Sequence, residues 1–151
     1  MSVEKQEIEK YLAETKLIVL ATVNENDAPA LRVLGAFGVD GYTFYYSTKG
    51  LAAKVKHTDK NPHVNALFQH ENQDPSQFIN VTIQGKAVQL SNDNDIEKAI
   101  KVIGSRSAKF KERVLKNGLE NNVLYRVDPL EVKVLDRRKG LGPDSINVIS
   151  F

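Results

Sequence analysis

The chain has no cysteine in its 151 residues. Disulfides, thiolate catalysis and zinc sites of the cysteine type are therefore excluded. The absence of cysteine is compatible with the reducing cytosol, and we expect a cytoplasmic protein. The N-terminus from Met1 to Lys10 is charged and amphipathic, and it does not have the pattern of a signal peptide.

The sequence also lacks a strong charge of either sign and a long apolar run. Its 21 Lys and Arg residues nearly balance 19 Asp and Glu residues, for a formal net charge of +2. This balance predicts no binding to nucleic acid or to an anionic membrane. The longest apolar run, Leu17 to Val23, is interrupted by Thr22 and is too short to span a bilayer.

Several nucleotide-binding and metal-binding motifs are missing. No G-x-G-x-x-G follows a strand and no Walker-type loop is present, so a Rossmann or P-loop nucleotide site is not expected. The histidines, His57, His63 and His70, have no carboxylates that complete a convincing ligand set. The sequence therefore predicts no metal site, and we expect these histidines at the surface or at helix caps.

What the sequence does contain is a series of strand patterns joined mostly by short turns. Its length suits one domain, residues 1–151, with a hydrophobic content of 41%. The Asp40-Gly41 pair predicts a tight hairpin turn. In two long strand segments, 78–90 and 123–135, the buried face switches at Gly85 and at Asp128-Pro129. Such switches are typical of a bulge or a barrel corner.

Helical patterns are inserted between the strands. The sequence predicts a short helix that ends near Thr15, and a helical segment over 92–120 that is broken near Gly104-Ser105. The tail from Gly140 is predicted to be irregular. About six strands with inserted helices favour a β-barrel of mixed α+β type over a doubly wound sheet.

The segment from Tyr42 to Phe68 is the best candidate for a binding site. An aromatic strand is followed by Ser47-Thr48-Lys49-Gly50 and by a short helix that carries Lys54. Hydroxyl groups, a helix N-terminus and a lysine suit a phosphate, and Arg32, one strand earlier, is placed to join them. The alternative is a capped helix with solvated lysines. Residue types alone leave both interpretations open.

The order of these parts resembles the pyridoxamine 5′-phosphate oxidase-like family of FMN-binding split barrels. The resemblance covers residues 8–136. It is carried by the segments IEKYLAETKLIVLATVNENDAPALRV, YTFYYSTKGLAAKVKHTDKNPHVNALF, FINVTIQGKAVQL and LYRVDPLEVKVLD. No single segment is as specific as a zinc motif, but their order and spacing together are fairly specific.

The resemblance implies a split barrel of about six strands and Greek-key type that works as a homodimer, with FMN at the subunit interface. It also implies a set of cofactor contacts. These would come from Arg32, Val33 and Leu34 along the flavin, from Ser47 and Thr48 at the phosphate or ribityl chain, from Lys54 at the phosphate, and from Asn80 at the flavin.

Two departures from the family pattern argue against the function of a vitamin B6 oxidase. Ala53 stands where the vitamin B6 oxidases have an arginine immediately before the phosphate lysine. Their C-terminal Arg-x-His motif is absent, because no histidine follows His70. A small general flavoprotein, of the kind grouped with bacterial general stress proteins, fits these residues better than a vitamin B6 oxidase.

We therefore expect an FMN-dependent oxidoreductase that uses a small-molecule substrate or a nicotinamide electron donor. The flavin carries the redox chemistry in such proteins, so hydride transfer needs no acid or base residue and no catalytic residue is predicted. The alternatives are a haem- or deazaflavin-binding protein of the same fold, and a non-enzymatic flavin-binding protein.

Overall fold

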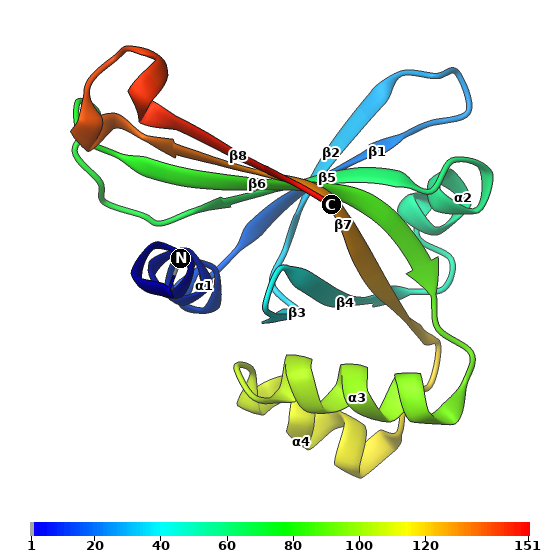
Figure 1. Cartoon of the computed structure of the whole chain (residues 1–151). Helices are drawn as coiled ribbons and strands as arrows, with labels where there is room; N and C mark the ends of the chain where they lie inside the picture. Colours follow the sequence, from blue (N-terminus) through cyan, green and yellow to red (C-terminus); the bar gives the residue numbers. More distant parts are fainter. Residues whose placement is uncertain (1) are drawn as a thin grey trace.

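The computed structural model describes residues 2–151, with side chains from Glu4 onward. One antiparallel sheet has the strand order β2-β1-β5-β6-β7-β4-β3, and β8 pairs with β7 (Figure 1). The strands are β1 (Ile18–Val23), β2 (Pro29–Leu34), β3 (Phe37–Asp40), β4 (Thr43–Lys49), β5 (His63–Gln69), β6 (Ile79–Gln89), β7 (Asn122–Asp136) and β8 (Ile146–Ser150). The sheet curls into a half-barrel, which confirms the predicted β-barrel of mixed α+β type.

The expected strand number is wrong, because the described residues form eight strands. One extra strand comes from the tail, where β8 pairs with the second half of β7 instead of remaining irregular. Its residues Ile146, Val148 and Ile149 are β-branched, and β-branched side chains pack well on a pleated surface. The tail therefore extends the sheet by one strand.

The helices lie in the predicted regions. They are α1 (Ser2–Glu14), α2 (Ala53–Lys60), α3 (Asp93–Gly104) and α4 (Ala108–Asn117), with short 3₁₀ turns η1 (Arg137–Lys139) and η2 (Pro143–Ser145). The side chain of Asn92 caps α3 by accepting hydrogen bonds from the backbone N–H groups of Asn94 and Asp95. No helix in the described part of the chain is long and apolar enough to cross a membrane.

The predicted barrel corner lies where β6 and β7 pair. Their register shifts between Gln84 and Gly85, opposite Pro129 on β7. Beyond this bulge β7 changes partner on its other edge, from β4 (Phe44 to Lys49) to β8. The face switch predicted at Asp128-Pro129 is confirmed, because the core residues of β7 change from Tyr125 and Val127 to Val132 and Val134. The switch predicted at Gly85 is wrong, because Val81, Ile83 and Ala87 of β6 are all buried while Val88 is exposed. The extra residue of the bulge lies on β7, so only β7 changes its buried face.

The two sides of β4 face two different cores. Phe44 and Tyr46 are buried inside the half-barrel, where Leu12 of α1 also packs. Tyr45 faces the other way and packs against Ile103 of α3 and against α4. The alternating aromatic residues of β4 are thus core residues, and this strand is held on both faces.

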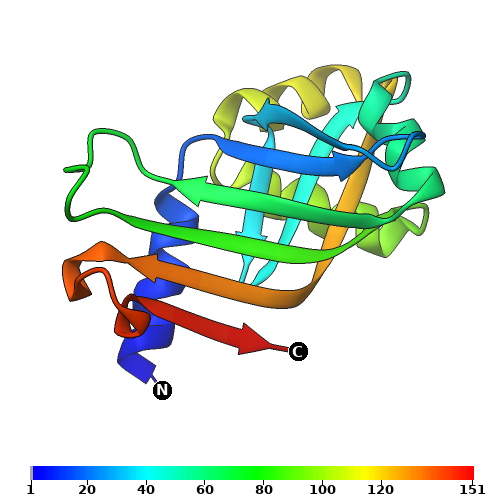
Figure 2. The ribbon, with the colours of Figure 1, turned by 90° about the horizontal axis from the view of Figure 1, so that it is seen from above.

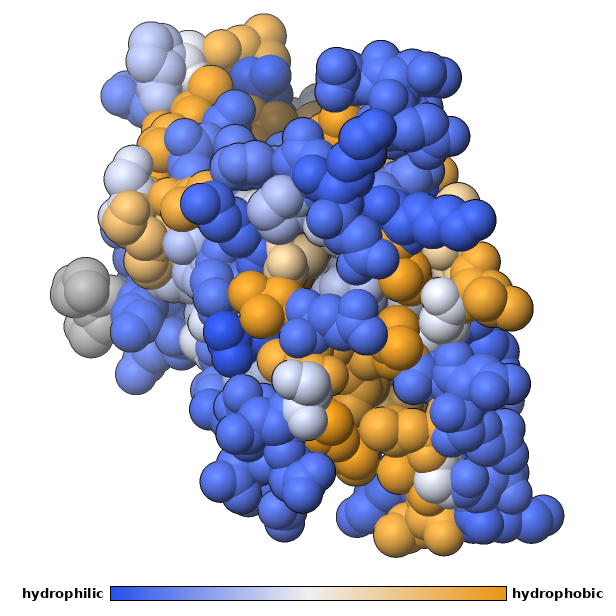
Figure 3. Space-filling view, turned by 90° about the vertical axis from the view of Figure 1, so that its right-hand side faces the viewer, coloured by the Kyte–Doolittle hydropathy of each residue, from blue (hydrophilic) through white to orange (hydrophobic). Residues whose placement is uncertain are grey.

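The outer face of β2, β1, β5 and β6 has no helix in front of it (Figure 2). Leu31 and Val33 of β2 point to this face and are 69% and 60% exposed. Figure 3, seen from the side on which α2 lies, shows further apolar side chains gathered between polar ones. An uncovered apolar surface of this kind marks a candidate contact face.

Candidate functional site: an anion-binding cluster

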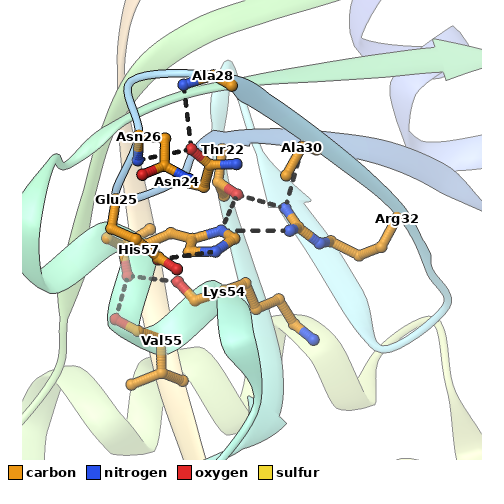
Figure 4. A network of polar contacts seen from close by, with 11 residues as sticks. Thr22, Asn24, Glu25, Asn26, Ala28, Ala30, Arg32, Lys54, Val55 and His57 are labelled. Carbon is orange, nitrogen blue, oxygen red and sulfur yellow. Dashed lines mark hydrogen bonds and ion pairs between the residues drawn. The ribbon is translucent and has the colours of Figure 1, made fainter.

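Arg32 lies on the inner side of β2. It pairs with Leu20 of β1, a fully buried core residue, and directly opposed residues of an antiparallel pair point to the same face. Its Nη1 donates a hydrogen bond to the hydroxyl of Thr22 at 2.6 Å (Figure 4). The same atom donates to the carbonyl of Leu20 at 3.3 Å. The guanidinium is therefore fixed against β1, at the edge of the barrel interior.

Lys54 is the second cation of the site. It lies in the first turn of α2 and is half-buried. Burial lowers the pKa of Lys54, and the nearby Arg32 guanidinium lowers it further. Among the described residues neither cation lies within ion-pair distance of a carboxylate. Two neighbouring, half-buried cations without a counter-charge would be stabilised by an anion.

A buried phenol lies beside these cations. The hydroxyl of Tyr46 is buried and has no hydrogen-bond partner among the described residues. Burial raises the pKa of Tyr46, and the Arg32 guanidinium partly opposes that rise. Tyr125 stacks on Tyr46, with ring centroids 5.0 Å apart. Tyr46 is therefore a neutral donor without an acceptor, which is unusual for a buried polar atom and calls for a ligand or a water.

His57 and Thr22 complete the cluster, and the sequence analysis missed both. The Nδ1 atom of His57 is 2.8 Å from the Thr22 hydroxyl and 3.5 Å from Nη2 of Arg32 (Figure 4). His57 is only 9% exposed, so the expected surface or capping position is wrong for this histidine. The reason is that α2 packs on β1. Thr22, a polar residue within an apolar strand, was the available signal, because a buried hydroxyl needs a partner.

The start of α2 is not capped by a side chain. Its N-cap residue, Ala52, makes no side-chain hydrogen bond, and the expected hydroxyls of Ser47 and Thr48 lie within β4. The alternative interpretation of a capped helix therefore lacks its cap. The N–H of Val55 donates to the Ala52 carbonyl, and the N–H groups of Ala53 and Lys54 before it are left for another acceptor.

The structure brings only some of the predicted site residues to the cluster. Thr48 shares the inner side of β4 with Tyr46, whereas Ser47 points to the opposite side, and both are buried. Leu34 is buried in the core and Val33 is exposed on the outer face. Strand alternation causes this division, because neighbouring side chains point to opposite faces.

Asn80 lies apart from the cluster within one chain. It pairs with Gln69 and donates a hydrogen bond to the side-chain oxygen of that residue at 3.2 Å. The next residue along β6, Val81, is buried inside the barrel. Asn80 therefore points to the outer face of the sheet. Its predicted contact with a flavin can therefore be made only from that outer face.

Arg106, which is partly buried, and Arg138, which is exposed, already have partners. Arg106 donates to the backbone carbonyls of Thr15, Lys16, Gly35 and Phe37, and so ties the α3–α4 turn to the barrel. Arg138 forms a forked ion pair with Asp136, beside a cavity of about 100 Å³ near α1. Glu7 and Asp144 also line that cavity, so it is not suited to an anion.

The chain is similar to known proteins in its family pattern and in its fold. The model of the family described as pyridoxamine 5′-phosphate oxidase matches residues 4–136. No curated protein sequence matches the chain.

Solved structures with similar folds differ in what they are described as binding. A heme binding protein from Mycobacterium smegmatis superposes with a TM-score of 0.80 at 15% identity, over 99% of this chain and 59% of that one. A relative of general stress protein 26, from Clostridium acetobutylicum, gives 0.72 at 14% identity over 97% and 94%. The heme storage protein HutZ of Vibrio cholerae gives 0.68 at 20% identity over 82% and 88%.

These likenesses establish the fold alone. The chain spans about 59% of the length of the mycobacterial heme binding protein. All three identities lie at or below 20%.

Proposed function

Because the chain belongs to the pyridoxamine 5′-phosphate oxidase family, we propose that it is an FMN-binding flavoprotein whose Arg32 and Lys54 hold the cofactor phosphate. One observation carries the proposal. The two cations share a half-buried site in which neither has a carboxylate partner among the described residues.

The chemistry of the donor set fits a phosphate. Arginine, lysine and a protonated phenol all donate hydrogen bonds, and a phosphate dianion only accepts them. The guanidinium of Arg32 makes its short protein contact through Nη1, and its Nη2 only approaches His57 at 3.5 Å, so it keeps further N–H donors for an anion. The unpartnered hydroxyl of Tyr46 and the uncapped start of α2 add neutral donors near the same place.

The proposed activity is that of an oxidoreductase with a small-molecule substrate or a nicotinamide electron donor. Bound FMN supplies hydride and electron transfer, and the protein anchors and orients it. Apart from His57, whose Nδ1 contacts Thr22, the side chains of the cluster are hydrogen-bond donors, which suits anchoring of a cofactor. Reduction of the purified protein by NADH or NADPH, followed by absorption, tests whether the flavin turns over.

Lys54→Ala is expected to weaken FMN binding by at least about tenfold, because one charge-assisted contact contributes roughly 1.5–3 kcal/mol. With Ala53 in place of the family's arginine, Lys54 has no basic neighbour on its N-terminal side to share this role. Riboflavin has no phosphate, so its affinity should barely change. Fluorescence titration of both ligands measures the difference.

Lys56→Ala is the matched control, because Lys56 is on the same helix but exposed. Its removal changes the net charge by the same amount without touching the cluster. Equal effects of the two substitutions, or an equal loss of riboflavin affinity, would show that Lys54 does not hold a phosphate.

We further propose a homodimer that packs through the outer face of the sheet. Leu31 and Val33 of β2 expose apolar surface there, and no helix covers them. Asn80 lies on the same face of the sheet, so a second subunit would bring it toward the neighbouring chain. A two-fold axis would then give two equivalent sites that each use both chains.

Light scattering at micromolar concentration is expected to give the mass of a dimer for the native chain and a monomer for Leu31→Asp. The introduced charge would lose its hydration inside the interface. Leu115→Asp is the control, because Leu115 is 78% exposed on α4, away from this face. A native monomer with flavin bound would rule the dimer out.

Haem binding is the second candidate, and the similar fold of two proteins described as binding or storing heme favours it. In this chain the ring nitrogens of His57 and His70 already contact Thr22 and the Tyr11 carbonyl. His63 is exposed, and neither of its ring nitrogens has a hydrogen-bond partner among the described residues, so it is the histidine to test first as an iron ligand. The absorption spectrum of the purified protein distinguishes flavin, deazaflavin and haem, and loss of a haem spectrum in His63→Ala would support this candidate.

A further inference from the structure

Thr22 connects His57 to Arg32 through a chain of hydrogen bonds. A guanidinium only donates, so the Thr22 oxygen accepts from Nη1 of Arg32 at 2.6 Å. The hydroxyl proton of Thr22 is then free to point to the second neighbour of the oxygen, Nδ1 of His57 at 2.8 Å. In this arrangement Nδ1 of His57 accepts a hydrogen bond from Thr22.

Charged groups of both signs lie around His57. The imidazole contacts Thr22 of β1 and lies 3.5 Å from the Arg32 guanidinium of β2. Lys54 is one turn earlier on the same helix. Glu25, in the turn between β1 and β2, lies 4.0 Å from Nε2 and is 68% exposed, so it opposes these cations only weakly.

An anion at Arg32 and Lys54 would reverse this balance. Its charge would offset Lys54 and Arg32, whose guanidinium lies 3.5 Å from the imidazole, and protonation of His57 would then add a third favourable charge. We propose that Thr22 and His57 position Arg32 for the anion, and that His57 takes up a proton when the anion binds. This inference rests on the anion site of the proposed function, and it adds a pH response to it.

The sign of the effect follows from linkage. If a bound anion favours protonated His57, then protonated His57 binds the anion more tightly by the same factor. Affinity should therefore rise as the pH falls through the titration of His57. Sulfate is the probe, because it stays a dianion across this range while a phosphate monoester gains a proton near pH 6.

The test compares sulfate affinity at pH 5.5 and pH 8 and constant ionic strength in the native chain, His57→Gln and His63→Gln. The native chain and His63→Gln are expected to bind about three- to tenfold more tightly at the lower pH, and His57→Gln to lose most of this difference. His63 is an exposed histidine on β5, so its substitution removes an imidazole without touching the cluster. Equal pH dependence in both variants, or no sulfate binding at all, would overturn the inference.

A second measurement needs no substitution at His57. The ring proton resonance of His57, assigned by elimination with His63→Gln and His70→Gln, is followed through a pH titration with and without sulfate. Sulfate should raise the apparent pKa of His57 and leave that of His63 unchanged. An unchanged His57 titration at saturating sulfate contradicts the proton uptake.

The positioning role of Thr22 has its own conservative pair. Thr22→Ser keeps the hydroxyl and should keep both sulfate affinity and its pH dependence. Thr22→Val has nearly the same shape without the hydroxyl and should lose both, whereas a purely structural role would lower stability and leave the pH dependence in place.

A chain that binds sulfate in this way but not FMN would refute the proposed cofactor and leave the coupling intact. FMN binding with the same pH dependence in the native chain and in His57→Gln would support the proposed cofactor and refute the coupling.

Discussion

Arg32→Ala is expected to weaken FMN binding by about a hundredfold or more, because a guanidinium can offer a phosphate two charge-assisted hydrogen bonds of roughly 1.5–3 kcal/mol each. This exceeds the effect expected for Lys54, which acts as a single point charge. Arg32→Lys should fall between the native chain and the alanine variant, because it keeps the charge and loses the fork.

The same substitution should change the stability of the apo protein by only about 1 kcal/mol. It removes the hydrogen bond to Thr22, but it also relieves Lys54 of a neighbouring positive charge. Arg113→Ala, an exposed arginine on α4, is the control for loss of a guanidinium. A sharp fall in the melting temperature of apo Arg32→Ala with unchanged FMN affinity would make Arg32 a structural residue and move the site elsewhere.

Gly85→Ala is expected to lower the free energy of unfolding by about 3 kcal/mol or more, because the new methyl group meets backbone rather than a flexible side chain. A Cβ at this position would lie 2.3 Å from the carbonyl oxygen of Asp128 and 2.8 Å from Cγ1 of Val127. Relief of this overlap requires β7 to move away from β6 at the bulge. β6 and β7 form the longest strand pair of the sheet, and this pair would then lose hydrogen bonds on both sides of the bulge.

Urea unfolding of the native chain, Gly85→Ala and Gly142→Ala measures this effect. Gly142 has no atom within 4 Å of the position of a Cβ and has an ordinary negative φ of −84°, so its substitution should be nearly neutral. For a chain of this size a loss of 3 kcal/mol corresponds to a fall of roughly 6–12 °C in the melting temperature. Equal midpoints for the two glycine variants would mean that the bulge can open at little cost.

Local chemistry made much of the fold predictable from the sequence. The Asp40-Gly41 hairpin follows from turn chemistry, since Gly41 adopts a φ of +64°. The bulge follows from the change in the alternation of apolar residues at Asp128-Pro129 of β7, and the break between α3 and α4 follows from Gly104-Ser105. The tail was missed because β8 is a short strand. Two 3₁₀ turns separate it from its partner, β7, so no tight hairpin turn marks the pairing in the sequence.

For the site, the sequence by itself determined which side chains can hold a phosphate and that Arg32 and Lys54 are the cations to test. Only the tertiary structure decided which groups surround them. The register of β1 with β2 places Thr22 and Arg32 together. The packing of α2 on β1 buries His57 against both of these side chains. The curl of the sheet brings the Tyr46 phenol to the same side, whereas strand alternation sends Val33 and Asn80 to the outer face. Residue type and spacing are local properties of the sequence. A site shared by several elements depends on strand register and on helix packing between segments far apart in the chain, and these are fixed only when the whole sheet has formed.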